Sequence, residues 1–221
     1  MENYMNDYLT IALPKGKLFT ISKNLLHRVG LSADHLSEKS RKLVIENKDL
    51  KVRFIIAKTS DVPTYVEYGA ADIGIIGKDV LLESQKDVYE ILDLGFGKCH
   101  LMMAVPQKEK RRRLLDYSYT RVATKYPHIA ESFFARQGMQ MEYIKLNGSI
   151  ELGPIVGLSE SIVDIVETGT TLAENDLEEI AHILDVSARL IVNRVSFKLK
   201  FHRINEIVNN LRLIIESGEI L

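Results

Sequence analysis

Short apolar runs alternate with longer amphipathic segments along most of the chain. Runs rich in β-branched and other apolar residues predict buried strands, because such side chains pack well on a pleated surface. In the first part of the chain these runs lie at residues 9–13, 42–46, 51–57 and 71–77. Segments 17–30 and 60–69 are predicted helices, the first stopped by Gly30 and the second carrying Pro63 in its first turn.

The pattern restarts after the apolar stretch at residues 88–106. Strands are predicted at 121–124, 141–146 and 161–166, and helices at 127–138 and 149–158. Strands that alternate with helices indicate an α/β fold with largely parallel sheets. The restart predicts two lobes, because each half repeats the alternation.

The end of the chain is predicted to rejoin the first lobe. Residues 179–193 form an apolar segment that can carry the backbone back, and 202–218 follow as a helix. Its apolar stripe indicates core packing or a subunit contact and comprises Ile204, Ile207, Val208, Leu211, Ile214 and Ile215. The predicted first lobe is residues 1–97 plus 186–221, and the second is 98–185.

Composition and charge narrow the class of protein. Hydrophobic residues make up 46% of the chain, and the 29 basic residues nearly balance the 30 acidic ones. The chain therefore has no global basic field that would attract nucleic acid or an anionic membrane, and an anionic ligand needs a local site. The single cysteine, Cys99, suits a reducing compartment, and neither a signal peptide nor a membrane span is evident. We expect a soluble, cytoplasmic protein.

The stretch "VDIVETGTTLAEN", residues 163–175, places three acids, three threonines and a glycine around the end of a predicted strand. Gly169 permits a positive φ or a close backbone approach. Thr168, Thr170 and Thr171 bring hydroxyl groups to the same small volume. The stretch is typical of an anion cradle, and equally of an ordinary strand-to-helix turn in which threonine caps the helix.

A second candidate anion site is "LPKGKL", residues 13–18. Gly16 lies between Lys15 and Lys17 at the junction of a strand and a helix, where unpaired N–H groups favour anions. The alternative is a pair of solvated lysines at a turn. The spacing of a Walker loop is missing.

Two further loops carry polar residues beside predicted strands. In "GAADIGIIGKDV", Asp72 precedes Gly74 and Gly77, which would let a flat ring approach the backbone or would serve tight packing. In "LNGSIELGP", Glu151 joins Asp164 and Glu167 as candidates for a sugar diol or a hydrated magnesium ion, whereas Ser149 can simply cap a helix.

Other chemistry is not favoured. The six histidines lack metal-ligand spacing and an evident carboxylate partner, no nucleophile-elbow motif presents a serine, and "GFGKCH" is only half of a dinucleotide fingerprint. The basic run at residues 108–113 has no interleaved aromatic residues, so it indicates a solvated surface rather than a nucleic-acid site.

Taken in order, the motifs resemble those of the ATP phosphoribosyltransferase family. The resemblance covers nearly the whole chain and rests on "LPKGKL", "DVPTYVEYGAADIGIIGKDVL", "LDLGFGKCHLMMAVP", "RVATKYPH" and "LNGSIELGPIVGLSESIVDIVETGTTL". It implies a reaction of ATP with 5-phosphoribosyl-1-pyrophosphate that needs magnesium. It also implies two α/β lobes of the type II periplasmic-binding-protein kind around a central cleft.

The resemblance also implies roles for individual residues. Glu167, Thr168, Gly169, Thr170 and Thr171 would hold the ribose 5-phosphate, and Asp164 with Glu151 would lie near the ribose and its Mg²⁺ ion. Residues of the first lobe would face ATP or the leaving pyrophosphate: Lys15, Gly16, Lys17, Asp72, Gly74 and Gly77. Among all of these, Asp164, Glu151 and Lys17 are the expected catalytic residues.

One position departs from the family pattern. Relatives often carry arginine before the "SDVP" helix, and Lys58 in "AKTSDVP" keeps the charge but not the bidentate grip. Salvage-type phosphoribosyltransferases place two acids side by side in the phosphate motif. Here Asp164 and Glu167 are separated by two residues, which disfavours that class.

The chain ends soon after its last predicted helix, so the resemblance is to the short form of the family. Such forms act with a histidyl-tRNA-synthetase-like regulatory subunit in a hetero-oligomer, and we expect the same partner here. Two other functions stay open from the residues alone. They are a cytoplasmic bilobal ligand-binding or regulatory module and a noncatalytic scaffold, because two-lobed α/β clefts serve recognition as well as catalysis.

Overall fold

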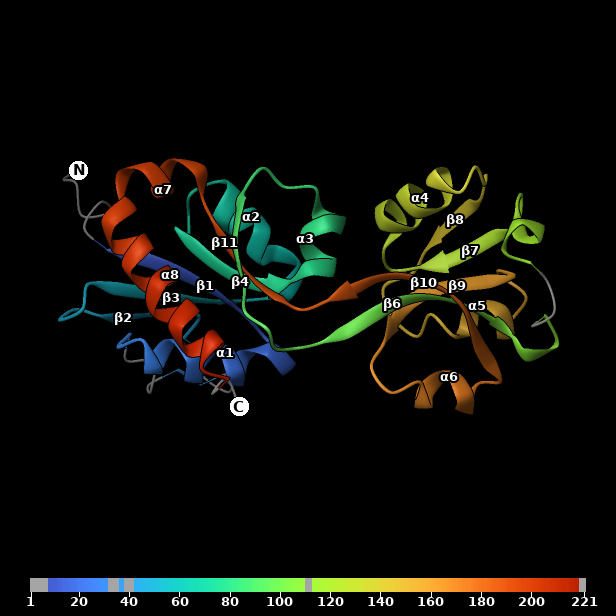
Figure 1. Ribbon diagram of the computed structural model, residues 1–221, viewed down its shortest axis with the longest axis horizontal. Coiled ribbons are helices and arrows are strands. Elements are labelled where there is room, and N and C mark those ends of the chain that lie inside the picture. The colour runs from blue at the N-terminus through green and yellow to red at the C-terminus, as the bar shows by residue number, and fades with distance from the viewer. Residues whose placement is uncertain (1–7, 32–35, 38–41, 110–112, 219–221) are drawn as a thin grey trace. The chain divides into compact units, whose positions relative to one another are not determined.

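The structure is a computed structural model that describes residues 8–31, 36–37, 42–109 and 113–218 (Figure 1). The backbone separates into two compact units. Unit 1 comprises Met1–Gly97 and Ser187–Leu221, and unit 2 comprises Lys98–Val186. Each unit has its own sheet and its own hydrophobic core.

Unit 1 is built on a six-stranded sheet. Its order is β2 (Val44–Asn47), β3 (Val52–Ala57), β1 (Leu9–Pro14), β4 (Ile73–Gly77), β11 (Ala188–Val192) and β5 (Tyr89–Asp93). Strand β1 pairs in parallel with β3 and β4, whereas β2, β11 and β5 run antiparallel to their neighbours. The carboxyl ends of β1 and β3 therefore lie at one edge of the sheet.

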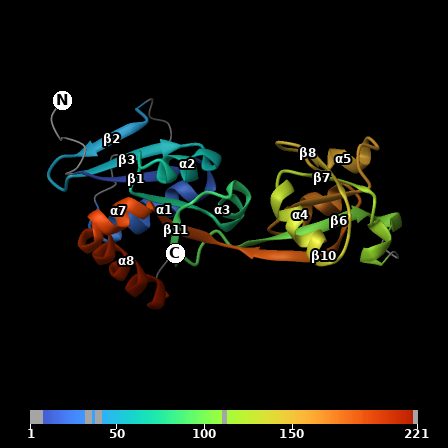
Figure 2. The ribbon, with the colours of Figure 1, turned by 90° about the horizontal axis from the view of Figure 1, so that it is seen from above.

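Helices cover both faces of this sheet (Figure 2). The largest core cluster joins the sheet to the predicted amphipathic helices, now α1 (Lys17–Arg28) and α8 (Phe201–Glu216). A second cluster joins the other face to α2 (Val62–Glu67), which follows a short 3-10 turn at Thr59–Asp61. The described part of unit 1 also contains the helices α3 (Lys78–Ser84) and α7 (Arg194–Leu199). The buried members of the α8 stripe, Ile204, Ile207, Val208 and Leu211, confirm core packing.

Unit 2 has a five-stranded sheet. Its order is β10 (Leu177–Val186), β6 (Cys99–Pro106), β9 (Ser161–Val166), β7 (Arg121–Thr124) and β8 (Glu142–Lys145). Helix α4 (Pro127–Arg136) packs on one face, while α5 (Leu152–Ile155) and α6 (Thr170–Glu174) lie on the other (Figure 1). Two short 3-10 segments lie at Gln107–Glu109 and Leu114–Tyr117.

The prediction of largely parallel sheets needs correction, because both sheets are mixed. Among the described strands of unit 2, only β7 pairs in parallel, with β8 and β9, whereas β6 and β10 run antiparallel to their partners. The antiparallel strands β6, β10 and β11 belong to the two chain segments that pass between the units. Hydrophobic periodicity identifies a strand but does not fix its direction.

The predicted helix at 149–158 is also shorter than expected. Only Leu152–Ile155 is helical, and a turn follows in which Gly157 has a φ of 71°. Gly153 accounts for part of this, since a side chain there would collide with Ser159 and Ala123. The close packing favours a single turn beneath the loop that carries Glu151.

Candidate active site

The parallel strands β7 and β9 of unit 2 bring several predicted polar residues to one edge of their sheet. Thr124 pairs with Val163 in the register of these strands, so the next residue of β9, Asp164, lies beside the carboxyl end of β7. Ile162 and Val166 share one core cluster with Ala123, on the face covered by α5 and α6. Because side chains alternate along a strand, Asp164 points to this same face.

Asp164 is a half-buried carboxylate with few stabilising contacts. Its pKa is raised from 3.8 to about 6, chiefly by burial and to a smaller extent by the nearby negative charge of Glu151. The backbone N–H of Ile165, which donates to Oδ1 at 2.8 Å, and the positive charge of Lys125 act in the opposite direction. A partly desolvated carboxylate beside a second carboxylate is typical of a site that binds a cation or a group that becomes positively charged.

Glu151 precedes the single turn of α5 and is half-buried. The loop before it is exposed, and Ser149 adopts a φ of 48°, a conformation that costs energy for a residue with a side chain. Ser149 was considered as a helix cap, but α5 has no side-chain cap, and the N–H of Leu152 bonds to the carbonyl oxygen of Ser149. The strained loop places Glu151 close enough to Asp164 for their charges to interact.

The threonine-rich loop follows β9 directly. Gly169 has a φ of 75°, in the left-handed region that favours glycine. The hydroxyls of Thr168 and Thr170 lie 3.0 Å apart, and the side-chain amide of Asn175 donates to the carbonyl oxygen of Thr171 at 2.8 Å. The three threonines are exposed. The loop therefore presents hydroxyl groups to solvent rather than using them to cap the helix.

One residue of this edge was not among the predicted site residues. Lys125 follows β7 immediately, is exposed, and is close enough to Asp164 to oppose its raised pKa. Its motif, "RVATKYPH", contributed to the family resemblance, but none of its residues was assigned a role. The signal that could have found it is positional, because a polar residue directly after a parallel strand lies at the edge where such sheets bind ligands.

Unit 1 gathers its predicted cations at the carboxyl ends of β1 and β3. The N–H of Lys15 bonds to the carbonyl oxygen of Ala57, and Lys58 is the next residue, so both lysines extend from neighbouring strands. Gly16 has a φ of 93° and lies where α1 begins at Lys17. These residues are exposed, so the structure brings Lys15, Gly16, Lys17 and Lys58 together at one edge.

Asp72 does not belong to that edge. It lies at the amino end of β4, beside Thr10, and the residue is only 5% exposed. Its oxygens accept hydrogen bonds from the Thr10 N–H at 2.7 Å, the Ser196 hydroxyl at 2.6 Å and the Lys200 ammonium at 2.7 Å. We therefore correct the prediction that Asp72 faces a ligand, because its carboxylate is occupied by these buried contacts and holds neighbouring elements of the fold together.

The glycines that follow Asp72 also have packing roles. A side chain at Gly74 would lie under 3.0 Å from Val62 and Val66 of α2. At Gly77 it would meet the carboxylate of Asp79, itself only 6% exposed. The alternative reading of these glycines, tight packing, accounts for both positions, since both are buried.

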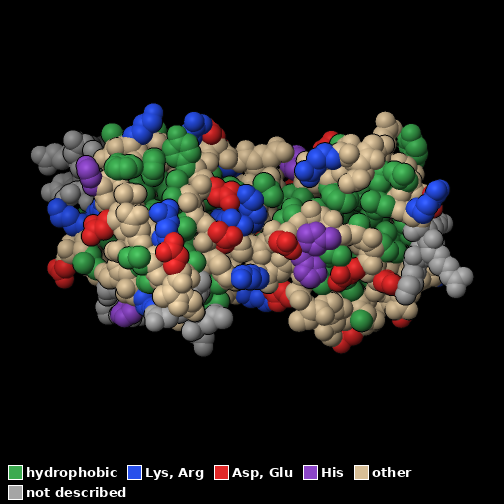
Figure 3. Space-filling view, in the orientation of Figure 1, with side chains coloured by type: hydrophobic (Ala, Val, Ile, Leu, Met, Phe, Trp, Pro, Cys, Tyr) green, Lys and Arg blue, Asp and Glu red, His purple; other side chains and the backbone are tan. Residues whose placement is uncertain are grey.

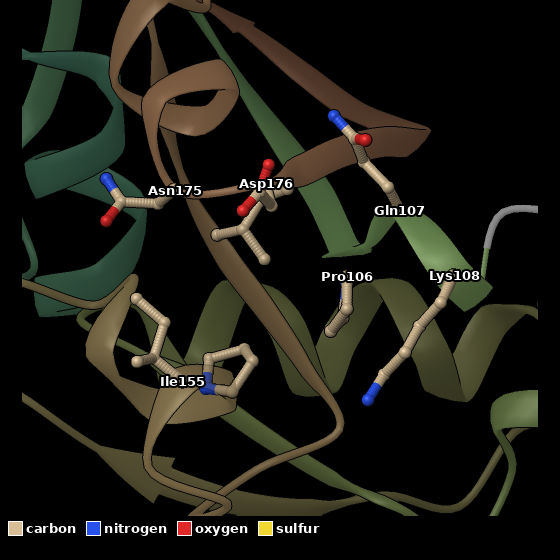
Figure 4. Close-up of a pocket in the computed structure, with 8 residues that line it drawn as sticks. Pro106, Gln107, Lys108, Ile155, Asn175 and Asp176 are labelled. Atoms are coloured by element: carbon tan, nitrogen blue, oxygen red, sulfur yellow. The ribbon is translucent and has the colours of Figure 1, made fainter.

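A cavity of about 350 Å³ lies elsewhere in unit 2 (Figure 4). It is lined by Pro106, Gln107, Lys108, Pro154, Ile155, Asn175, Asp176 and Leu177. Because β6 runs antiparallel to β9, Pro106 is at the edge opposite to the carboxyl end of β9. The cavity thus has no predicted site residue in its lining. Of the basic run at 108–113, residues 110–112 lie outside the described residues.

The described residues do not by themselves form a metal site with three or more protein ligands. No three His, Cys, Asp or Glu side chains are arranged among them to hold a metal ion.

One histidine has a carboxylate partner that the sequence did not indicate. His182 Nε2 lies 2.9 Å from Asp185 Oδ1, and the centre of the His182 ring is 6.1 Å from that of His100. Figure 3 shows histidine side chains gathered on one face of unit 2. In the part of the chain that is described, no helix is long and apolar enough to cross a membrane.

Comparisons with known proteins agree on one family. The family model of HisG, ATP phosphoribosyltransferase, matches residues 58–213. The chain is 52% identical over 216 residues to the ATP phosphoribosyltransferase of Desulfitobacterium hafniense, covering 95% of this chain and 97% of the relative. It is 51% identical over 208 residues to that of Geobacter metallireducens, covering 94% and 98%.

Solved structures extend the likeness to the fold. The chain is similar to the ATP phosphoribosyl transferase (HisG:HisZ) complex from Thermotoga maritima, with a TM-score of 0.80, 33% identity, and coverage of 95% of this chain and 99% of that chain. A substrate-binding protein of an amino acid ABC transporter matches with a TM-score of 0.62 and 12% identity, over 96% of this chain and 95% of that chain. The second likeness concerns the fold alone, and it confirms the predicted type II periplasmic-binding-protein architecture.

Proposed function

The chain belongs to the ATP phosphoribosyltransferase family, and from this premise we propose how its two units divide the work of that reaction. The enzyme joins N1 of the adenine of ATP to C1 of 5-phosphoribosyl-1-pyrophosphate and releases pyrophosphate, the first step of histidine biosynthesis. Unit 2 holds the phosphoribosyl donor, and the exposed cations of unit 1 bind phosphates of ATP or the leaving pyrophosphate. Family membership sets aside the noncatalytic alternatives.

The observation that carries this proposal is the environment of Asp164. Breaking the bond between C1 and pyrophosphate leaves positive charge on the ribose, and a fixed carboxylate nearby stabilises that charge. Asp164 and Glu151 supply two carboxylates at one edge of the sheet, and burial has already desolvated Asp164. The protein needs no nucleophile, because N1 of the adenine forms the new bond to C1 while the bond to the pyrophosphate oxygen breaks.

The threonine-rich loop is the proposed site of the ribose 5-phosphate. Hydroxyl and backbone N–H groups donate hydrogen bonds to phosphate oxygens. Thr168, Thr170 and Thr171 are exposed beside Gly169, whose missing side chain leaves room for a phosphate to approach the backbone. Glu167 begins this loop, and its carboxylate is suited to the ribose hydroxyls. The loop follows Asp164 along the same strand, so phosphate and ribose sites are neighbours.

We also propose that Mg²⁺ binds between Asp164 and Glu151, either directly or through water. Magnesium usually binds one or two carboxylates and keeps waters and substrate phosphates as its other ligands. Two carboxylates that repel each other, and the lack of a larger cluster in the described residues, fit such a site. When bound, the ion neutralises negative charge on the donor's pyrophosphate.

In unit 1 we propose that Lys15, Lys17 and Lys58 bind phosphate oxygens. Lys15 and Lys58 extend from paired strands, and Gly16 allows close approach of an anion to the start of α1. Lys17 is the proposed catalytic cation, since it occupies the first turn of a twelve-residue helix, where the helix dipole adds to its charge. Asp72, Gly74 and Gly77 support this unit from its interior.

A histidyl-tRNA-synthetase-like regulatory subunit is the proposed partner. Support comes from the Thermotoga maritima relative, which was solved as a HisG:HisZ complex and of which 99% is covered by this chain. We place the assembly in the cytoplasm, because one cysteine in 221 residues suits a reducing compartment.

The test is to incubate the protein with ATP, the phosphoribosyl donor and Mg²⁺, with and without the partner subunit, and to detect the coupled nucleotide by mass spectrometry. We expect product, and alanine at Thr168 or Thr171 should weaken binding of the donor about 10-fold, the worth of one lost hydrogen bond to a charged group. Absence of product from the folded, associated proteins would overturn the assignment. Unchanged donor binding in both alanine variants would overturn the role of the loop.

A further inference from the structure

An exposed lysine occupies a distinct place at the catalytic edge of unit 2. Lys125 comes directly after β7, and the last residue of that strand, Thr124, pairs with Val163. By this register Lys125 lies beside Asp164. Lys125 has no assigned role in the proposed reaction.

The alternation of the two strands fixes the face to which Lys125 points. Ala123 belongs to the core cluster beneath α5 and α6, together with Ile162 and Val166. Lys125 is two residues after Ala123, and Asp164 is two residues after Ile162, so both side chains point to this face. The effect of the lysine's charge on Asp164 agrees with this placement.

The backbone around Lys125 is held firmly. The buried hydroxyl of Thr124 donates to the carbonyl oxygen of Val163 at 2.7 Å and accepts from the N–H of Tyr126 at 2.9 Å. Tyr126 is 4% exposed, and the ammonium of Lys125 lies 5.7 Å from the centre of its ring. Within the described part of the chain, that ammonium makes no hydrogen bond or ion pair. A lysine whose backbone is held in place and whose ammonium has no bonding partner among the described residues is suited to bind an anionic ligand.

The sheet order indicates which part of the donor reaches Lys125. Strand β9 lies between β6 and β7, and β10 lies beyond β6. A side chain at Gly169 of the threonine-rich loop would lie 3.7 Å from the carboxylate of Glu179 on β10, so the loop extends toward β10. Lys125, directly after β7, is on the opposite side of Asp164. A ribose at Asp164 that directs its 5-phosphate to the loop therefore directs its C1 substituent toward β7.

We propose that Lys125 binds the pyrophosphate group of the phosphoribosyl donor and stabilises the negative charge that this group gains as it leaves. The inference rests on the proposed function and adds a catalytic residue to it. When the bond from C1 to the pyrophosphate oxygen breaks, its electron pair stays on pyrophosphate, and the Lys125 ammonium then interacts more strongly with that group than in the ground state.

The neighbouring strand offers a matched control. Lys145 ends β8, is exposed, and pairs with Thr124 in the parallel register. Tyr143, two residues earlier, packs in the cluster on the α4 face. Lys145 therefore points to the face opposite to Asp164, although it is a lysine at the same edge of the same sheet.

The experiment compares Lys125→Met, Lys125→Arg and Lys145→Met with the wild type, each in the full chain with the partner subunit. Steady-state kinetics gives kcat and KM for the donor, and calorimetry gives the affinities for inorganic pyrophosphate with Mg²⁺ and for ribose 5-phosphate. We expect Lys125→Met to lower kcat/KM about 10- to 100-fold, mainly through kcat, and to weaken pyrophosphate binding about 10-fold. Ribose 5-phosphate should bind as before, Lys125→Arg should retain most activity, and Lys145→Met should match the wild type.

Two results would overturn the assignment of Lys125. One is wild-type kcat/KM in Lys125→Met, and the other is equal loss of pyrophosphate and ribose 5-phosphate affinity, which would indicate a general structural role. A wild-type protein that forms no product would instead overturn the proposed function, and the role of Lys125 with it. The two failures are distinguishable. If only the assignment of Lys125 is wrong, the wild type and Lys145→Met still form product, whereas neither forms product if the proposed function is wrong.

Discussion

Two aspartates, one in each unit, lie in or next to a parallel strand and are partly or fully buried, yet their surroundings differ. Asp72 of unit 1 accepts three hydrogen bonds, one of them from the ammonium of Lys200. Asp164 of unit 2 accepts one, from the adjacent N–H of Ile165, and faces a second carboxylate. The first carboxylate is satisfied by the fold, and the second is not.

The difference separates structural from functional acids. A buried charge that is fully hydrogen-bonded joins elements together, as Asp72 joins the start of β4 to β1 and α7. A carboxylate left with a raised pKa and a nearby uncommitted lysine costs stability, and such costs concentrate at functional sites. Burial alone therefore does not identify a catalytic acid, whereas burial without sufficient partners does.

The largest expected effect is on the fold of unit 1. Asp72→Ala would leave the ammonium of Lys200 buried without its carboxylate, and removing one partner of a buried ion pair costs about 3–5 kcal/mol of unfolding free energy. Urea unfolding measures the loss, with Asp49→Ala, at an exposed aspartate of the same unit, as the control. A loss of less than about 1 kcal/mol, a typical effect of a point mutation, would contradict the structural role of Asp72.

The next effect is on catalysis in unit 2. Asp164→Asn keeps the shape of the side chain but removes its charge, and we expect kcat/KM to fall about 100- to 1,000-fold, as for other single groups that stabilise transition-state charge. Steady-state kinetics at pH 8 with the donor varied measures the fall. Wild-type activity in the variant would show that the half-buried charge of Asp164 is not needed.

Activity should also depend on pH through the same group. The pKa of Asp164 is about 6, so the reactive ionised form is lost as the pH falls through that value. We expect wild-type kcat/KM to decline about 10-fold for each pH unit below this midpoint, as for a single required base. The residual activity of Asp164→Asn should lack this midpoint. Retention of the same midpoint in the variant would assign the titration to another group.

The sequence predicted where strands and helices lie, but it predicted much less about which strands pair and which side chains contact one another. The apolar periodicity located β1, β3, β4, β7, β9 and the helices α1, α4 and α8, because each has a buried face. It could not give the direction of β6 and β10, which depends on long-range pairing. It could not show that Asp72 is neutralised by Ser196 and Lys200 either, since these residues lie 124 and 128 positions away.

The candidate site shows the same division. Asp164 within β9 and the loop from Glu167 to Thr171 after it were predicted together, because they are local in sequence. Lys125 was missed because its relation to Asp164 arises from the register of β7 against β9. Hydrophobic periodicity is sufficient to predict strands. The residues of the site, however, are brought together by the order of the strands in the sheet, which periodicity does not predict.

A smaller effect is expected on the stability of unit 2. Because the pKa of Asp164 is raised from 3.8 to about 6, the unfolded chain releases this proton more readily than the folded protein. The folded state is thus favoured below pH 4 and loses that advantage as the pH rises through 6. Asp164→Asn should raise the free energy of unfolding at pH 8 by about 1–3 kcal/mol, since one pKa unit is worth about 1.4 kcal/mol. Urea unfolding at pH 4 and pH 8 measures it, and no gain at pH 8 would contradict the raised pKa.

The smallest expected effect is that of Lys125→Met on stability, and it sharpens the comparison between the two lysines near these aspartates. Lys200 is 16% exposed and bonded to Asp72 and to the carbonyl oxygen of Tyr8, so its loss should destabilise unit 1 by several kcal/mol, on the order of a broken buried ion pair. Lys125 is exposed and bonded to no described residue, so its replacement should change the unfolding free energy by less than about 0.5 kcal/mol. Urea unfolding of Lys125→Met and Lys200→Met measures both. Similar losses in the two variants would mean that Lys125 supports the fold, and its kinetic defect could then no longer be ascribed to contact with pyrophosphate.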